Sequence, residues 1–222
     1  MEISIPIKRE QDLSDIAYER IKEMILDTVL KPGEVIFTPK LARIFQVSRT
    51  PVREALARLK QEGWIISTDG QGFLVSPLTP TDINEIFETS LFLEPPAIKL
   101  FTEVASDQLL NELWDPTEKI ESQIVKGEFE LYFDIHMKLH NSYIHNCPNN
   151  ILKDFLIHVN DLMNRLRIYT RSEPSRHVLV AYKEHKQIIM ALKTRDGGMA
   201  QEALANHIQG ARQRILEQVD NI

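Results

Sequence analysis

Four histidines in the second half of the chain have a spacing that could hold a metal ion. His136 and His140 lie four residues apart, so they project from one face of a helix, while His185 and His207 fall in two later helical segments. A divalent ion inside a helical bundle needs ligands from facing helices, and a pair at i and i+4 supplies two of them. Imidazole suits zinc, nickel, copper or iron better than magnesium or calcium, and zinc is the ion that we expect, with nickel as the alternative. Histidines are also common as surface or hydrogen-bonded residues, so spacing alone leaves both interpretations open.

A second set of residues that could do chemistry is a cluster of basic side chains near the start of the chain. Within residues 38–60 only Glu54 is acidic, against these basic residues: Lys40, Arg43, Arg49, Arg53, Arg58 and Lys60. Residues 1–77 carry as many basic as acidic side chains, so the whole net charge of −6 belongs to the remainder. Such a positive window is expected for contact with nucleic-acid phosphates, although a solvated helix face would look the same.

The elements around the basic cluster predict a winged helix-turn-helix. The apolar spacing predicts an amphipathic helix over 12–30, and Thr38 and Pro39 open a short helix that ends at a turn of Gln46 and Val47. Ser48 caps the next helix, which Gly63 closes. The runs 64–67 and 73–76, separated by the turn-forming residues 69–72, predict a β-hairpin wing.

Beyond a proline-containing linker at 77–80, the sequence predicts only helices. We expect them near 81–104, 106–126, 128–146, 149–172, 174–195 and 197–220, with Pro95 and Pro96 kinking or splitting the first. The fold class is therefore mainly α, with a DNA-binding domain over 1–77 and an all-helical bundle over 78–222.

Several classes of protein are excluded or disfavoured by composition. The single cysteine, Cys147, excludes an internal disulfide and an all-cysteine zinc site. No apolar run reaches the length of a membrane span, and the first ten residues lack the apolar core of a secretory signal. We therefore expect a cytoplasmic protein that does not bind membranes.

The helix-turn-helix carries the residues that identify a family. In such a motif the second helix lies in the major groove with its N-terminal residues at the base edges. Residues 41–63 read LARIFQVSRTPVREALARLKQEG, which closely resembles the highly specific GntR-family pattern LA-x-x-F-x-VSRTPVREAL-x-RL-x-x-EG. The resemblance, to the FadR-like subfamily, implies DNA contacts by Ser48, Arg49, Thr50 and Arg53, with Gly70 of the wing tip at the minor groove. Lys40 and Arg43 join this set by their charge. Asp69 and Gln71 flank Gly70 where relatives often place a basic residue.

The second domain resembles the FCD type of GntR effector domain, in its VanR-like six-helix subset. In metal-containing FCD domains an Asp precedes the first ligand His by four residues, and that His is followed by an Asn and by one His in each of two later helices. The matching residues are His140, Asn149, His185 and His207, whereas His136 stands in the Asp position. A mononuclear site of four histidines is the resulting hypothesis, and the loss of the carboxylate should weaken hard ions more than zinc or nickel.

The resemblance also implies an effector and a mechanism. FCD domains commonly bind small organic acids at the metal, and Arg165, Arg167 and Arg171 are candidates by charge for completing that contact, although a solvated helix face is an alternative. Relatives often carry an Arg at the position of Ser90, four residues before Glu94. We expect a homodimer on an imperfect palindrome, acting as a repressor that a carboxylate ligand releases from its operator.

Two alternatives remain for the metal. An ion with an open coordination position could activate water in a hydrolase, but the chain has neither a phosphate-binding glycine loop nor a nucleophile elbow. The ion could instead be purely structural, in which case chelation would unfold the bundle. We expect a regulator and not an enzyme.

Overall fold

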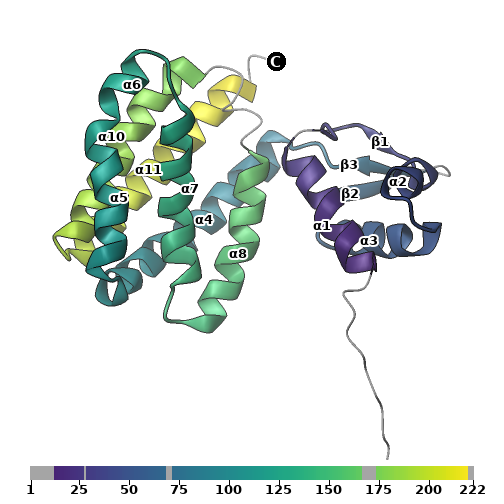
Figure 1. The fold of residues 1–222 in the computed structure, drawn as a ribbon, viewed down its shortest axis with the longest axis horizontal. Coiled ribbons are helices and arrows are strands. Elements are labelled where there is room, and N and C mark those ends of the chain that lie inside the picture. Colours follow the sequence, from purple (N-terminus) through teal and green to yellow (C-terminus); the bar gives the residue numbers. More distant parts are fainter. Residues whose placement is uncertain (1–12, 28, 69–71, 167–173, 220–222) are drawn as a thin grey trace, which may run out of the picture. The chain divides into compact units, whose positions relative to one another are not determined.

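A computed structural model describes residues 13–27, 29–68, 72–166 and 174–219 of the chain (Figure 1). The chain divides into two compact units, residues 1–78 and 79–222. Within the described residues no helix has both the length and the apolar character needed to cross a membrane.

The first unit contains three helices and a small sheet among its described residues, and it confirms the predicted winged helix-turn-helix. Its elements are α1 (Leu13–Leu26), β1 (Val35–Ile36), α2 (Thr38–Phe45), α3 (Arg49–Gln61), β2 (Ile65–Thr68) and β3 (Gly72–Val75). The sheet is antiparallel in the order β1-β3-β2, with Ile65 opposite Val75 and Ile36 opposite Phe73. The two-residue β1 was not predicted, because so short a strand has no alternation to detect.

The turn between α2 and α3 depends on one unusual backbone conformation. Gln46 follows α2 with φ 56° and ψ 38°, and its amide donates to carbonyls of the last turn of α2. This left-handed residue ends α2 and lets α3 start in a new direction. Ser48 is the N-cap of α3, as predicted, although its side chain makes no capping hydrogen bond, whereas Phe37, and not the predicted Thr38, is the N-cap of α2.

The apolar face of α3 packs on α1 and the sheet. Val52, Ala55, Leu56 and Leu59 are completely buried, as the sequence predicts. Two polar contacts join α1 and α3 at the edge of this core. The Tyr18 hydroxyl donates to Glu62 at 2.5 Å, and Arg58 pairs with Asp15 at 2.6 Å.

The second unit is a bundle of helices, as predicted. Its described helices are α4 (Pro80–Val104), α5 (Asp107–Lys119), α6 (Glu121–Val125), α7 (Glu130–His145), α8 (Asn150–Arg165), α10 (Pro174–Lys193) and α11 (Gly197–Val219). The long helix α4 packs against α11, α8 and α7, and α10 packs against α11 and α5 (Figure 1). A capping box of Thr79 and Asp82 begins α4, which continues through Pro95 and Pro96 instead of splitting there.

The single helix predicted over 106–126 is interrupted at Ile120. Ile120 and its immediate neighbours are neither proline nor glycine, although Pro116 lies four residues before the break, and a tertiary contact supports the interruption. The Tyr182 hydroxyl of α10 donates to the carbonyl of Thr117 at 3.0 Å, just before the break. A hydrogen bond to a side chain from another helix thus occupies a carbonyl near the end of α5.

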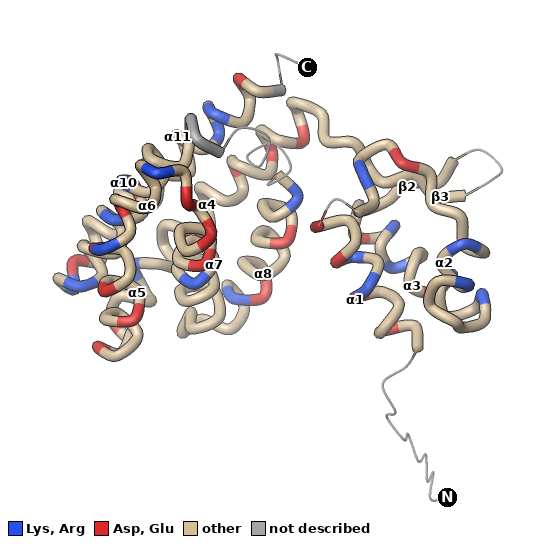
Figure 2. The backbone as a smooth tube through the Cα atoms, turned by 45° about the horizontal axis from the view of Figure 1, so that its top comes forward, with Lys and Arg blue, Asp and Glu red and all other residues tan. Residues whose placement is uncertain are grey.

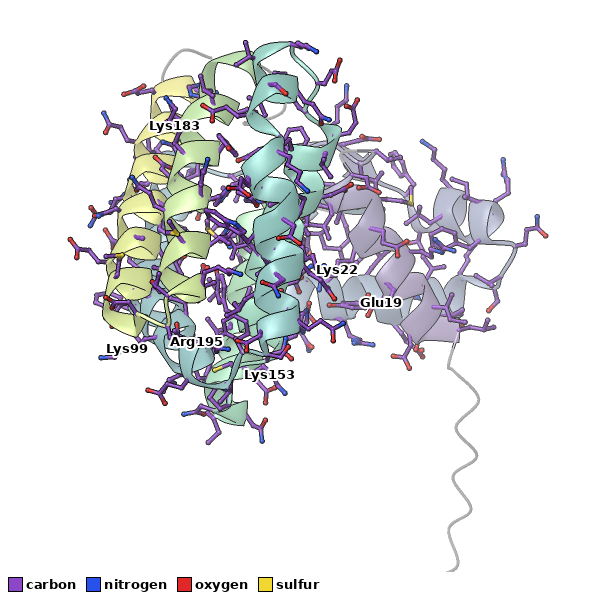
Figure 3. The ribbon with its side chains drawn as sticks, turned by 60° about the vertical axis from the view of Figure 1, so that its left-hand side comes forward. Glu19, Lys22, Lys99, Lys153, Lys183 and Arg195 are labelled. Carbon is purple, nitrogen blue, oxygen red and sulfur yellow. The ribbon has the colours of Figure 1, made fainter. Side chains whose placement is uncertain are left out.

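Arg195 ties together three helices at one end of the bundle, where Figure 3 also places Lys99. Its backbone is left-handed, with φ 58°, two residues after the end of α10. Its guanidinium donates to the carbonyls of Thr102 and Ala105 at the end of α4, at 3.1 and 2.5 Å, and to the Asp107 carboxylate at the start of α5, at 2.5 Å. One side chain thereby caps α4 and fixes the turn into α5.

Candidate metal centre and DNA-binding motif

All four predicted histidines meet inside the second unit. His136 and His140 come from α7, His185 from α10 and His207 from α11. Each of the first three offers a nitrogen atom within 4.8 Å of the others, and the His207 ring lies against His185 with 4.3 Å between ring centroids. His185 and His207 are buried, and the other two are half-buried.

The separations between ring nitrogens fit a shared ion. Nε2 of His185 lies 3.2 Å from Nδ1 of His136 and 3.2 Å from Nε2 of His207. Two nitrogens bound to one tetrahedral zinc at about 2.0–2.1 Å would be about 3.3–3.4 Å apart. Burial lowers the pKa of His185 well below the ordinary value, and the neighbouring histidines lower it further. Burial also lowers the pKa of His207. The neutral imidazole that results is the form that binds a metal.

His140 is held by a buried chain of hydroxyl and carboxylate groups. The hydroxyls of Tyr143 and Ser90 both donate to Glu94, and Nδ1 of His140 lies 2.7 Å from the Tyr143 oxygen. Because the Tyr143 hydroxyl uses its only hydrogen to donate to Glu94, its oxygen must accept a hydrogen bond from Nδ1–H of His140. Nε2 of His140 then carries a lone pair, and this buried atom has no partner among the described residues.

The contacts of Glu94 favour its ionised form. Burial would raise the pKa of this carboxyl group, but His140 and, to a smaller extent, the hydroxyls of Ser90 and Tyr143 outweigh that effect and hold the pKa below its ordinary value. Burial and the adjacent Glu94 carboxylate raise the pKa of Tyr143 well above the usual value for tyrosine. Tyr143 therefore remains a proton donor to Glu94 and an acceptor for His140.

His207 is held by a carboxylate of its own. Its Nδ1 lies 2.8 Å from Oε2 of Glu184, and Arg214 makes two contacts of 2.8 Å with the same carboxylate. These partners lower the pKa of Glu184 although burial would raise it. A Cβ atom at Gly210 would come within 2.9 Å of Glu184 and 3.0 Å of Arg214, so the absence of a side chain there makes room for the pair.

A cavity of about 340 Å³ lies beside the histidines. Its lining includes His136, His140, His207 and Arg214, together with apolar residues of α4, α7, α8, α10 and α11. Such a volume accommodates a small organic molecule. The arrangement combines a set of metal-binding nitrogens with space for a ligand next to them.

None of the three arginines that the sequence suggested for ligand binding is among the described residues that line the cavity. Arg165 is half-buried at the end of α8 and is not among the residues that line the cavity, and its charge acts on Asp82. Arg167 and Arg171 lie outside the described residues. The arginine that lines the cavity is Arg214, which sequence reasoning missed, although its position seven residues after His207 on one helix face was a usable signal.

Asn149 and Asp134, which lie close in sequence to the predicted metal-binding histidines, do not contribute to the histidine cluster. Asn149 is the N-cap of α8, where its side chain accepts from the Leu152 amide at 3.0 Å. Asp134 is exposed and lines the cavity, but it is not part of the group that could hold an ion. Asn149 therefore has a structural role in starting a helix.

The predicted DNA-contact residues of the first unit lie on an accessible surface. Those described are all exposed: Lys40, Arg43, Ser48, Arg49, Thr50 and Arg53. Figure 2 shows lysine and arginine positions on α2 and α3, the two helices of the helix-turn-helix. Gly70 lies outside the described residues. Arg58 differs from the others, because it pairs with Asp15 and covers the Tyr18 ring at 4.1 Å.

Comparison with known proteins agrees with both units. The family of bacterial regulatory proteins named gntR matches residues 13–75, and the FCD domain matches residues 85–210. An uncharacterized HTH-type transcriptional regulator, YdhC of Bacillus subtilis (strain 168), is 33% identical over 86% of this chain and 85% of its own length. The Nta operon transcriptional regulator of Aminobacter aminovorans is 31% identical over 84% of this chain and 87% of its own length.

The fold is also that of a solved regulator. The structure of McbR/YncC from E. coli superposes with a TM-score of 0.79 at 25% identity, covering 94% of this chain and 99% of that one. The homologues are transcription regulators and not enzymes. The chain belongs to the gntR family of bacterial regulatory proteins, with a winged helix-turn-helix followed by an FCD domain.

Proposed function

We propose that this protein is a metabolite-responsive repressor of transcription. Its first unit binds operator DNA, and its second unit binds a small carboxylate at a transition metal, zinc or nickel, held by His136, His140, His185 and His207. Binding of the carboxylate releases the DNA. The observation that carries the proposal is the convergence of four histidines from three helices beside a cavity.

The positions of the hydrogens and lone pairs on the imidazole nitrogens support a bound metal over a cluster of histidines that only hydrogen-bond to one another. Nδ1–H of His207 donates a hydrogen bond to Glu184, and Nδ1–H of His140 donates a hydrogen bond to Tyr143, so in the neutral imidazoles both Nε2 atoms carry lone pairs. Nε2 of His185 can carry at most one proton, so it cannot donate a hydrogen bond to both of its nitrogen neighbours, Nδ1 of His136 and Nε2 of His207, which each lie 3.2 Å away. Nε2 of His140 has no partner among the described residues. When bound, a metal would supply a Lewis acid for these lone pairs and for a ligand carboxylate.

The exposed face of α3 supports the DNA-binding part. Arg49 and Arg53 lie on one exposed face, while Val52 and Leu56 anchor the opposite face in the core. A guanidinium can make a bidentate contact with guanine, and Ser48 and Thr50 at the start of the helix can hold phosphate. Because helix-turn-helix proteins read two half-sites as two-fold dimers, we propose a homodimer and an imperfect palindrome as its operator.

Regulation requires that the ligand prefer one arrangement of the DNA-binding units over another. The shift in DNA affinity then equals the difference in ligand affinity between those arrangements. The name of the Nta operon regulator supports control of an operon. The family's usual mode, release of a repressor by its ligand, supports the direction of the effect.

The first test is elemental analysis of protein prepared without a histidine tag. We expect about one transition-metal ion per chain, and its loss in His140→Ala and His185→Ala. The controls are His145→Ala and His158→Ala, whose exposed side chains lie outside the cluster. A stoichiometric metal retained in His140→Ala would contradict the four-histidine site. Unfolding of the second unit on chelation would show that the metal is structural.

The second test is selection of binding sites from a pool of random DNA duplexes. We expect enrichment of an imperfect palindrome, and release of the selected DNA from the metal-loaded protein when carboxylates are added. Failure to enrich any sequence would contradict operator binding. Selection of a single half-site would contradict the dimer.

A further inference from the structure

The wall of the cavity carries both polar and apolar side chains. Outside the histidine cluster its polar lining residues include Asn160, Asn164, His177 and Gln218, whereas these lining residues are apolar: Phe87, Met137, Met163, Val178, Ile208 and Ile215. The apolar residues come from α4, α7, α8, α10 and α11, so apolar side chains approach the cavity from several directions. A ligand with its acid group at the histidines would therefore place much of the rest of its body against hydrocarbon groups.

The helical register gives the length of this apolar part. Val178 lies seven residues before His185 on α10, and Ile215 lies eight residues after His207 on α11. At a rise of 1.5 Å per residue these offsets are about 10 and 12 Å. Because α10 and α11 are consecutive helices packed against each other with a short connection, they run in opposite directions, and both offsets point the same way. Apolar side chains thus line the cavity at positions up to about 10 Å along the helix axes from the histidines.

The charges around the cavity favour a ligand with a single negative group. Arg214 is the only lysine or arginine among the described residues that line the cavity, and the other basic lining residues are histidines. Both ends of its guanidinium are taken by Glu184. Two carboxylates, Glu94 and Asp134, also line the cavity. A second acid group on the ligand would be buried near apolar and acidic side chains, which is costly without a cation of its own.

We infer that the ligand of this cavity is a monocarboxylate with an apolar alkyl or aryl body. Dicarboxylates and polyhydroxylated sugar acids, whose bodies are polar, are the classes that it disfavours. The inference rests on the proposed function, because the acid group is placed at the metal. It adds the chemical class of the rest of the molecule, which comes from the lining of the cavity and from the pairing of Arg214 with Glu184.

The test is calorimetric titration of the zinc-loaded, full-length protein with acetate, butyrate and hexanoate. Each buried methylene should tighten binding about fourfold, so the dissociation constant should fall steadily along the series. Succinate, which has the chain length of butyrate and one more carboxylate, should bind about tenfold or more weakly than butyrate. A flat series, or tighter binding of succinate or gluconate than of butyrate, would overturn the inference.

A variant locates the effect in this cavity. Ala211 lines the cavity, so Ala211→Leu should weaken hexanoate several-fold while leaving acetate unchanged. Ala203→Leu is the matched control, because Ala203 lies on the same helix but does not line the cavity. Equal loss for acetate and hexanoate in Ala211→Leu would contradict the placement of the apolar body. The metal content of each sample separates the two levels: protein without metal fails the proposed function, whereas metal-loaded protein that prefers succinate fails only the inference.

Discussion

His207 and Glu184 are joined by a contact of 2.8 Å between Nδ1 and Oε2, on the side of the imidazole away from His185. The same carboxylate is fixed from the other side by Arg214. A carboxylate behind a ligand histidine sets its tautomer and ring orientation and increases its basicity. Glu184 therefore keeps the hydrogen of His207 on Nδ1 and leaves Nε2 with a lone pair that can bind an ion.

Glu184→Gln should weaken metal binding about 10- to 100-fold while the bundle remains folded. The amide oxygen can accept a hydrogen bond from Nδ1–H of His207, but the amide has no charge with which to hold Arg214 or to increase the basicity of the ring. Competition with a chromophoric zinc chelator measures the change. Glu202→Gln, at an exposed position of α11, is the control and should bind metal like the unmodified protein. Equal affinity in both variants would remove Glu184 from the site.

Tyr143→Phe should reduce metal affinity as well as stability, because the proton on Nδ1 of His140 loses its acceptor and Glu94 loses a donor. We expect the free energy of unfolding to fall by about 1–3 kcal/mol, as for other buried groups left without a partner. Tyr182→Phe is a matched control, since its buried hydroxyl donates to the Thr117 carbonyl, away from the histidines. Denaturant titration and chelator competition on both variants separate the effects: only Tyr143→Phe should change metal affinity. The same affinity loss in both would indicate a purely structural effect.

The sequence was sufficient for the fold and for the pairing of His136 with His140 on one helix face, because both leave local patterns. The helix-turn-helix has caps, a proline near a helix start and a buried stripe of apolar residues, and His136 and His140 have helical spacing. His185 and His207 could be added because the resemblance to FCD domains supplied their roles. Their meeting point depends on how three helices pack, and no local pattern in the chain contains that information.

The residues that support the histidines could not be predicted for the same reason. Glu94 and Tyr143 are far apart in the sequence, and so are Glu184 and Arg214, so each pair depends on tertiary packing. The break at Ile120 is another case, because α5 continues through Pro116 and ends only where Tyr182 makes a contact that depends on tertiary packing. Charge alone pointed to Arg165, Arg167 and Arg171 for the ligand. Charge does not tell which face of a helix meets the cavity, and Arg165 is not among the residues that line it, whereas Arg167 and Arg171 lie outside the described residues and stay predictions.

Arg195→Ala should destabilise the second unit, because it removes the hydrogen bonds to the carbonyls of Thr102 and Ala105 and leaves a left-handed residue with a side chain. Arg195→Gly removes the same hydrogen bonds but tolerates the left-handed backbone. We therefore expect Arg195→Ala to be the less stable of the two by about 1 kcal/mol in denaturant titration. Equal stabilities would mean that the backbone conformation costs nothing at this position.

The basic residues of the first unit should separate into two groups when they are replaced by alanine. Arg53 is exposed on α3, so Arg53→Ala should weaken operator binding by about 1–3 kcal/mol if it reads a base, and should leave thermal stability nearly unchanged. Arg58 belongs to the same helix but pairs with Asp15 and covers Tyr18, so Arg58→Ala should lower stability by about 1 kcal/mol. Fluorescence anisotropy with the selected operator and thermal unfolding of both variants give the two readouts. Loss of operator discrimination in Arg58→Ala as strong as in Arg53→Ala would contradict the assignment of a stabilising role, and no DNA contact, to Arg58.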